Sequence, residues 1–320
     1  MKHQLKIKSI ELAKELHTRI ENLNDFDIFS FSSLADKVPN TVTFATSKYY
    51  KTIDFNHFPE DILLIAPVEF EGEKRQNTIY VDNPLKDFLH LIKKYVRDKH
   101  TQPPGNIHHT AIIDPRAIIH PSVSIGAYSI IGMCKIDEGS VIKEHVHVYD
   151  HVDIGKNVIL YSSTEIGTED FGPIIQKDGE IEMFPQIGSL IIEDGVQVFP
   201  FTAIGRGTLG ATIIKSGVKI DHCCQIGHNT IIGTNSIITA NSIILGSAII
   251  GKNCWIGSGS IIKNQIEIGD GVTTGMGSVI TKSIPGGYTV AGNPAIELQQ
   301  MIQERKTLKR LINNAQADEK

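Results

Sequence analysis

Residues 214–280, IKSGVKIDHCCQIGHNTIIGTNSIITANSIILGSAIIGKNCWIGSGSIIKNQIEIGDGVTTGMGSVI, repeat with a period of six. Isoleucine recurs at every sixth position from Ile214 to Ile268, Thr274 interrupts the series once, and Ile280 resumes it. Such a period fits neither an α-helix, with about 3.6 residues per turn, nor an amphipathic strand, whose faces alternate. It fits short strands joined by regular corners. The stretch therefore predicts a parallel β-helix of hexapeptide repeats, in which each coil buries its apolar face against its neighbours.

The same period extends toward the N-terminus. It runs through residues 107–131, slips by one residue, and continues through residues 136–166. The period disappears over residues 168–185, which predicts a loop that projects from one coil. A shorter break covers residues 206–210, and the Pro-Gly-Gly sequence at 285–287 ends the series.

Residues 1–101 lack this period and predict a small α/β domain. A helical pattern covers residues 4–22, and Asn83-Pro84 begins a second helix that continues to Val96. Between them, short β patterns lie at residues 28–31, 42–44, 62–65 and 78–81. We therefore predict an α/β domain over 1–101, a mainly β solenoid over 102–285, and a C-terminal cap and helix over 286–320. The helix is expected to cover the last coil, because an open solenoid end exposes strand edges.

The composition restricts the class of protein. The chain has 320 residues, of which 41% are hydrophobic and 21% charged, and a formal net charge of −5, which argues against a nucleic-acid-binding surface. The first residues carry no secretory signal and no apolar run could span a bilayer, so we expect a cytoplasmic protein. The cysteines, which lie among the predicted inward-facing strands, are expected to be reduced and buried: Cys134, Cys223, Cys224 and Cys254.

Histidines stand out on a solenoid that is rich in isoleucine, glycine, serine and asparagine. His228 follows the inward Ile226 by two residues. Three hexapeptides form one coil of about 18 residues, which places Gly246 directly above His228 at a strand spacing of about 4.8 Å. A glycine there leaves its N–H uncovered, so a general base and an oxyanion donor would face one cleft. The alternative is that Gly246 only turns a corner.

His222 occupies the equivalent place one hexapeptide earlier, but the residue above it is Ala240. We interpret His222 as an ordinary surface histidine. Cys223 and Cys224 lie beside it, but their spacing matches no metal-binding pattern, and we expect no metal site.

The chain resembles the N-acyltransferases of the lipid A pathway, which place a 3-hydroxyacyl chain on the glucosamine amine of a UDP-sugar. The likeness covers nearly the whole chain. It rests on residues 33–50 and 80–84 in the N-terminal domain, and on residues 184–188, 217–229 and 274–277 in the solenoid. The resemblance implies a left-handed β-helix, a nucleotide-binding N-terminal domain, and a homotrimer with active sites between subunits.

By this resemblance, His228 aligns with the family's catalytic base and Gly246 with its oxyanion glycine. Asn229 follows in the same matching segment and is expected to bind the substrate. Phe44 and Tyr50 align with an aromatic pair that sandwiches uracil, although an aromatic pair is also an ordinary feature of a small core. Ser47 replaces the family's base-reading asparagine.

The donor side of the chain departs from the family. Gly275 and Met276 lie in the segment that matches its acyl-donor region. Asn293 and Pro294 instead belong to a segment, residues 288–295, that looks like sugar acetyltransferases using acetyl-CoA. Three further departures are noted: Gly205 replaces an aspartate, Gln265 a second functional histidine, and Ser278 a methionine of the acyl-chain region.

These residues lead to one hypothesis with two alternatives. The first is an N-acetyltransferase that moves acetyl from acetyl-CoA to a UDP- or dTDP-linked amino sugar for surface polysaccharide or lipopolysaccharide, with no permanently bound cofactor. The second is the lipid A N-acyltransferase itself, which uses 3-hydroxyacyl-acyl carrier protein. The more distant alternative is a non-catalytic or metal-dependent β-helix.

Overall fold

A computed structural model describes residues 6–16, 22–96 and 105–318, with side chains up to residue 312. The chain forms two compact units, residues 1–101 and 102–320. The junction between them, residues 97–104, lies outside the described residues.

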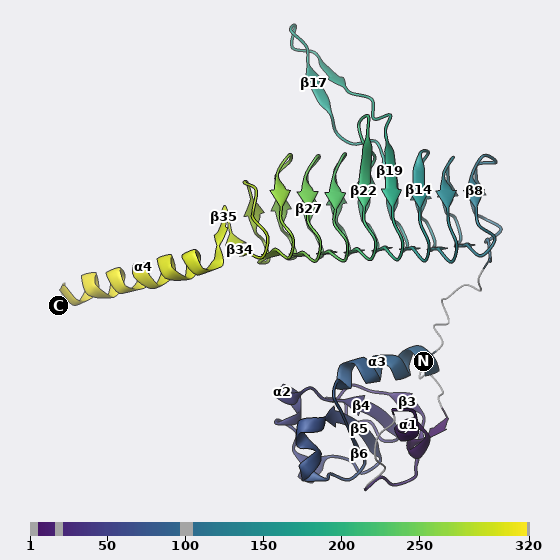
Figure 1. Cartoon of the computed structure of the whole chain (residues 1–320), viewed down its shortest axis with the longest axis vertical. Helices are drawn as coiled ribbons and strands as arrows, with labels where there is room; N and C mark the ends of the chain where they lie inside the picture. Colours follow the sequence, from purple (N-terminus) through teal and green to yellow (C-terminus); the bar gives the residue numbers. More distant parts are fainter. Residues whose placement is uncertain (1–5, 17–21, 97–104, 319–320) are drawn as a thin grey trace. The chain divides into compact units, whose positions relative to one another are not determined.

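The first unit is built on a parallel β-sheet (Figure 1). The sheet has the order β3–β4–β5–β6, and all six residues of the interior strand β5 are buried. The elements of the unit are β1 (Ile7–Lys8), α1 (Ser9–Glu15), β2 (Asp27–Ile28), β3 (Ser30–Phe31), β4 (Thr41–Phe44), α2 (Ser47–Tyr50), η1 (Phe55–His57), β5 (Ile62–Pro67), η2 (Val68–Glu73), β6 (Thr78–Val81) and α3 (Pro84–Tyr95).

Both predicted helices of this unit form, but only the second one matches its predicted bounds. α3 begins where the sequence predicts, because the Asn83 side-chain oxygen accepts a hydrogen bond from the Lys86 N–H at 3.1 Å. The helix predicted at residues 4–22 is shorter, since Ile7 pairs with Ile28 in the antiparallel β1–β2 ribbon and leaves only α1 helical among the described residues. Residues 4, 5 and 17–21 of that prediction lie outside them.

The second unit is a left-handed parallel β-helix, which confirms the coils predicted from the isoleucine repeat and the handedness that the resemblance implies. In the described residues its three sheets contain nine, eight and ten strands, stacked coil upon coil (Figure 1). Ile226 pairs with Ile244 and Ile244 with Ile262, so each step between coils is 18 residues here. The sequence therefore sets which side chains lie above one another.

The strands of the first sheet are β7 (Ile112–Ile113), β10 (Ile130–Ile131), β13 (His147–Val148), β16 (Glu165–Thr168), β21 (Ala203–Gly205), β24 (Gln225–Ile226), β27 (Ile243–Ile244), β30 (Ile261–Ile262) and β33 (Val279–Ile280). Those of the second are β8 (Ile118–Ile119), β11 (Lys135–Ile136), β14 (Val152–Ile154), β19 (Ser189–Ile192), β22 (Ala211–Ile214), β25 (Ile231–Ile232), β28 (Ile249–Ile250) and β31 (Glu267–Ile268). Those of the third are β9 (Ser124–Ile125), β12 (Val141–Ile142), β15 (Ile159–Leu160), β20 (Gln197–Val198), β23 (Lys219–Ile220), β26 (Ile237–Ile238), β29 (Trp255–Ile256), β32 (Thr273–Thr274), β34 (Thr289–Gly292) and β35 (Ala295–Glu297).

The periodic isoleucines form the core of the solenoid. Every isoleucine of the series from Ile214 to Ile280 is at most 1% exposed, and Thr274 is 2% exposed. Full burial of one such side chain stabilises the fold by about 1.5–3 kcal/mol. Because the core is one continuous column, the corners that carry polar side chains are held at fixed heights along it.

The loop predicted over residues 168–185 is a β-hairpin. Strands β17 (Pro173–Ile175) and β18 (Ile181–Met183) pair antiparallel and project from the coils between β16 and β19 (Figure 1). Every residue of both strands is exposed, Ile175 by 74% and Ile181 by 69%. The hairpin is thus an apolar arm with no packing partner among the described residues of its own chain.

The end of the solenoid differs from the prediction. Strand β34 pairs with β32, and β35 then pairs antiparallel with β34, so backbone hydrogen bonds extend the third sheet. Helix α4 (Leu298–Asp318) packs near its start, where Met301 approaches Gly292, and leads away from the coils (Figure 1). Leu308 and Leu311 on it are exposed. A strand hairpin, rather than the length of the helix, therefore continues the last sheet.

The cysteines match their prediction only in part. Cys134, Cys224 and Cys254 are buried, and burial raises the pKa of Cys134 to about 12 and that of Cys224 to about 11. Cys223 is exposed because it takes a corner position with a φ of 58°, outside the strand. Within the residues that the structure describes, no helix combines the length and apolar character needed to cross a membrane.

Candidate active site

The candidate site lies at the corner that follows the first sheet. β24 ends at Ile226, and the chain turns through Gly227, His228 and Asn229 toward β25. β24 pairs with β21 on one side and with β27 on the other, which puts Arg206 one coil before His228 and Gly246 one coil after it. The predicted stacking of Gly246 on His228 is therefore present in the fold.

Asp170 holds His228 in place. One carboxylate oxygen of Asp170 accepts hydrogen bonds from the backbone N–H of His228 at 2.7 Å and from its ring Nδ1 at 2.8 Å. Asp170 comes from the segment between β16 and the hairpin, 58 residues earlier in the chain. Gly205 leaves room for it, since a Cβ on Gly205 would lie only 3.2 Å from the Asp170 Cβ.

This pairing determines which ring nitrogen can act as a base. Burial acts to raise the pKa of Asp170, but the hydrogen bonds from His228 outweigh it and the pKa is lowered. An ionised carboxylate can only accept, so Nδ1 carries the hydrogen. Nε2 of His228 then bears the lone pair, and the imidazole side chain is 28% exposed at the corner.

Gly246 is the residue against which the imidazole lies. A Cβ at position 246 would come 2.4 Å from Cε1, 2.6 Å from Nε2 and 2.8 Å from Nδ1 of His228. Only a residue without a side chain leaves the ring where Asp170 holds it. This geometry goes beyond turning a corner, which was the alternative explanation for the glycine.

The N–H of Gly246 is open. At comparable corners a carboxylate takes this hydrogen, as Asp270 does from the Lys252 N–H at 2.9 Å. Among the described residues, no acceptor pairs with the Gly246 N–H, although the flanking N–H of Ser247 donates to the His228 carbonyl at 2.7 Å. An unpaired donor beside the Nε2 lone pair is the arrangement that an oxyanion requires.

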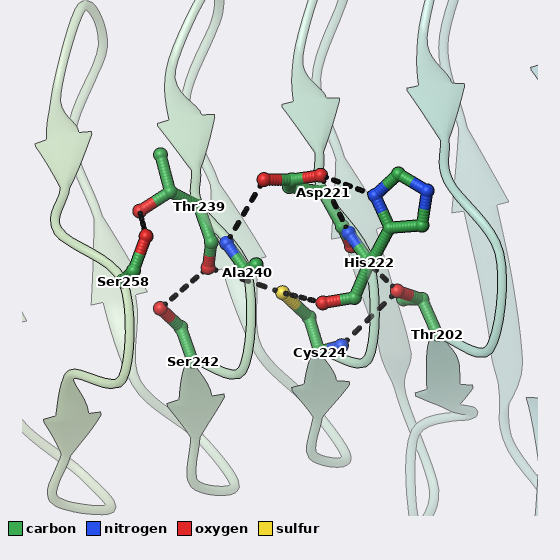
Figure 2. A network of polar contacts seen from close by, with 8 residues as sticks. All are labelled: Thr202, Asp221, His222, Cys224, Thr239, Ala240, Ser242 and Ser258. Carbon is green, nitrogen blue, oxygen red and sulfur yellow. Dashed lines mark hydrogen bonds and ion pairs between the residues drawn. The ribbon is translucent and has the colours of Figure 1, made fainter.

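His222 provides a comparison within the same fold. Figure 2 shows its ring against Asp221, with an Nδ1 to carboxylate distance of 2.6 Å. The residue one coil above is Ala240, and its N–H already donates to the other oxygen of Asp221 at 3.1 Å. A second histidine–aspartate pair therefore exists, but without an open donor beside it. Histidine and aspartate alone do not distinguish the two corners.

Asn229 supports the corner. Its side-chain oxygen accepts a hydrogen bond from the Thr208 N–H at 3.0 Å, and its own N–H donates to the Thr212 hydroxyl at 2.9 Å. These contacts tie the His228 corner to residues 206–210, the break in the repeat. The side-chain oxygen of Asn229, a residue predicted to bind the substrate, is therefore already engaged within the protein.

The N-terminal unit contains a cavity of about 630 Å³. Of the three residues that the resemblance assigns to nucleotide binding, Phe44 lines it, whereas Ser47 and Tyr50 do not. Tyr50 is 2% exposed and stacks on Phe70 with ring centroids 4.3 Å apart. Burial raises the pKa of Tyr50, as does its contact with Tyr80. Tyr49, which is exposed, lines the cavity with Phe44 instead.

The four residues predicted to bind the donor lie together, but at another corner. Gly275 and Met276 follow the third sheet, and the Gly275 N–H donates to the Val290 carbonyl at 2.8 Å. Asn293 and Pro294 form the turn between β34 and β35 next to them, and Met276 is 84% exposed. His228 follows the first sheet, so a single chain does not bring this group to His228.

Sequence reasoning missed Asp170. It lies in the segment where the repeat is lost, and no spacing rule connects it to a residue 58 positions later. A signal was present, because Gly205 leaves a space at the coil before His228 that a carboxylate can occupy. As for metals, the described residues contain no group of three or more His, Cys, Asp or Glu side chains arranged to hold an ion.

Comparisons with known proteins identify the class of protein to which the chain belongs. Residues 247–282 match the family described as bacterial transferase hexapeptide (six repeats). The solved UDP-N-acetylglucosamine O-acyltransferase of Moraxella catarrhalis superposes with a TM-score of 0.54 at 28% identity, covering 64% of this chain and 81% of that one. The solved LpxA structure of Acinetobacter baumannii superposes with a TM-score of 0.54 at 28% identity, covering 62% of this chain and 77% of that one. The chain is thus a hexapeptide-repeat acyltransferase.

Two curated relatives narrow the family. UDP-3-O-acylglucosamine N-acyltransferase of Coxiella burnetii is 30% identical over 238 residues, covering 68% of each chain. The protein of the same name from Pseudomonas syringae pv. syringae is 31% identical over 247 residues, covering 70% of this chain and 68% of its own. The chain belongs to the UDP-3-O-acylglucosamine N-acyltransferase family.

The Asp170–His228 contact leads to a testable prediction. Asp170→Asn is expected to lower kcat/KM about 10- to 100-fold, the range typical of losing a partner that orients a functional side chain. Without the negative charge the protonated imidazole is less stable, so the acid limb of the pH–rate profile should move to lower pH. Steady-state rates across pH, with melting temperature measured in parallel, check both effects.

Asp221→Asn is the matched control, because Asp221 holds His222 in the same way. It should leave both the rate and the acid limb unchanged. An Asp170→Asn enzyme with a wild-type acid limb would show that Asp170 does not act on the candidate base, His228.

Proposed function

We propose that the protein transfers an acyl group from a thioester to the amino group of a UDP-linked glucosamine in lipid A synthesis. The observation that carries this proposal is the His228 corner, where a histidine oriented by Asp170 lies against Gly246 with its open N–H. The names of the curated relatives supply the sugar and the bond formed.

The geometry suggests how the residues would act. The neutral amine attacks the thioester carbonyl while Nε2 of His228 accepts its proton, a contribution of about 10²–10⁴ in rate. The Gly246 N–H stabilises the oxyanion that forms, by about 3 kcal/mol for one good donor. The C–S bond then breaks, the thiolate leaves, and the imidazolium returns the proton to sulfur. No step requires a covalent enzyme intermediate.

The donor ranking changes from the one predicted from the sequence. The relatives favour the lipid A reaction, so 3-hydroxyacyl-acyl carrier protein ranks first and acetyl-CoA second. One argument for acetyl-CoA also weakens, since Ser278 is buried and its hydroxyl donates to the Gly275 carbonyl at 2.7 Å. Such a side chain does not line a surface groove. The turn at Asn293–Pro294 beside Gly275 still favours acetyl-CoA as the second candidate.

A homotrimer with sites between subunits is part of the proposal. Two observations support it: the donor-side residues lie at a different corner from His228, and the apolar β17–β18 arm is exposed. A neighbouring copy would bring a second corner to His228 and would cover the arm.

The test pairs each donor with each acceptor, using the full chain. We expect thiol release and a new amide by mass spectrometry with 3-hydroxyacyl-acyl carrier protein and a UDP-linked 3-O-acyl-glucosamine. Turnover with acetyl-CoA but not with 3-hydroxyacyl-acyl carrier protein, tested across UDP- and dTDP-linked amino sugars, would reverse the donor ranking. No amide formation with any pair would contradict N-acyl transfer.

A further inference from the structure

Arg206 is a buried arginine next to the candidate site. It follows β21, and the pairing of Ile204 with Ile226 sets it one coil before His228. Its side chain and backbone together are only 9% exposed. Arginine is seldom this buried without a partner for its charge.

The contacts of Arg206 leave most of its guanidinium unused. Nε donates to the Gly167 carbonyl at 2.8 Å, and the backbone N–H donates to the Thr168 carbonyl at 3.0 Å. Among the described residues, no carboxylate lies within ion-pair distance of Arg206, and no acceptor pairs with its two terminal nitrogens. Glu165 contacts His147 instead, at 3.7 Å.

The direction of the side chain follows from these contacts. Gly167 belongs to β16, and β16 and β24 lie on opposite sides of β21. The guanidinium therefore extends away from His228, toward the earlier coils. There its positive charge acts to lower the pKa of Tyr149. Gly246, with the open N–H, lies on the other side of His228.

Neither terminal nitrogen of Arg206 is among the fully buried side-chain atoms that lack a partner in the described residues, so both reach the surface. A guanidinium presents a planar fork of donors that matches phosphate oxygens. We infer that Arg206 binds the diphosphate of the nucleotide sugar, on the side of His228 opposite the oxyanion donor. This inference rests on the proposed function for the identity of the nucleotide. It places the two substrates on opposite sides of His228, with the nucleotide toward β16 and the acyl donor toward β27.

The experiment measures binding of three probes, uridine, UDP and inorganic pyrophosphate, by calorimetry. The wild-type chain should bind UDP more tightly than uridine. Arg206→Met should weaken UDP and pyrophosphate about 10- to 100-fold, as expected for loss of charge-assisted hydrogen bonds, and leave uridine unchanged. Arg206→Lys keeps the charge but not the planar fork of donors, so it should weaken UDP binding by about tenfold. This variant also keeps the inference testable if the methionine variant does not fold.

Lys219→Met is the matched control. Lys219 is also a partly buried cation, its amine donates to the Gly195 carbonyl at 2.5 Å, and burial lowers its pKa, but it lies on the third sheet. It should bind all three probes as wild type does.

Two results would overturn the inference: wild-type affinity for UDP and pyrophosphate in folded Arg206 variants, or equal affinity of the wild-type chain for uridine and UDP. Arg206-dependent pyrophosphate binding in a chain that acylates no UDP-amino sugar would support the inference while contradicting the proposed function.

Discussion

His228→Ala is expected to lower kcat about 10²–10⁴-fold and to leave KM for the nucleotide sugar nearly unchanged. The reason is that Nε2 is the proposed proton acceptor, whereas the diphosphate of the nucleotide is proposed to bind Arg206 and not the imidazole. The corner should still form, because the backbone N–H that contacts Asp170 remains in the variant. Steady-state kinetics and thermal melting measure these effects.

His222→Ala is the control for this variant. His222 also pairs with an aspartate, but the N–H above it is taken by that same aspartate. Its loss should leave kcat within about twofold of wild type, given that it contacts no open donor. If His228→Ala kept more than about a tenth of the wild-type kcat, general-base catalysis by His228 would be wrong.

Gly246→Ala is expected to lower kcat about 10²–10⁴-fold, as for loss of a general base, with little change in melting temperature. The added methyl group would stand within 2.4–2.8 Å of three imidazole atoms, so the ring must leave its place beside Asp170. The ring is a side chain at a partly exposed corner and can rotate outward, which limits the cost in stability. Kinetics and melting curves of the same preparation separate the two effects.

A double variant tests whether the methyl group of Gly246→Ala acts by displacing the imidazole. If the methyl group acts by displacing the imidazole, His228→Ala with Gly246→Ala should be no slower than His228→Ala alone. Ala240→Gly is the matched control at the His222 corner and should leave kcat unchanged. Full activity in Gly246→Ala would exclude a role for the contact between this glycine and the imidazole.

Two parts of the first unit show one prediction that the structure confirms and one that it corrects. The pattern from Asn83 to Val96 predicted α3, because a cap and a proline at the first position act within one helical turn. The uracil-binding pair was predicted from a resemblance between linear segments. In the folded unit Phe44 lines the cavity while Tyr50 stacks on Phe70 in the core. Which of two adjacent tyrosines faces the cavity depends on packing, and the spacing alone did not separate them.

The sequence by itself determined the β-helix and the stacking of Gly246 on His228. Both follow from one period, since a column of buried isoleucines places residues 18 positions apart on adjacent coils. Only the tertiary structure decided the partner of His228 and the burial of Arg206. Asp170 reaches the corner from the segment where the period is lost, and the Arg206 side chain donates to the Gly167 carbonyl, 39 residues earlier in the chain. Contacts of that kind depend on the path of the folded chain, and no local periodicity records it.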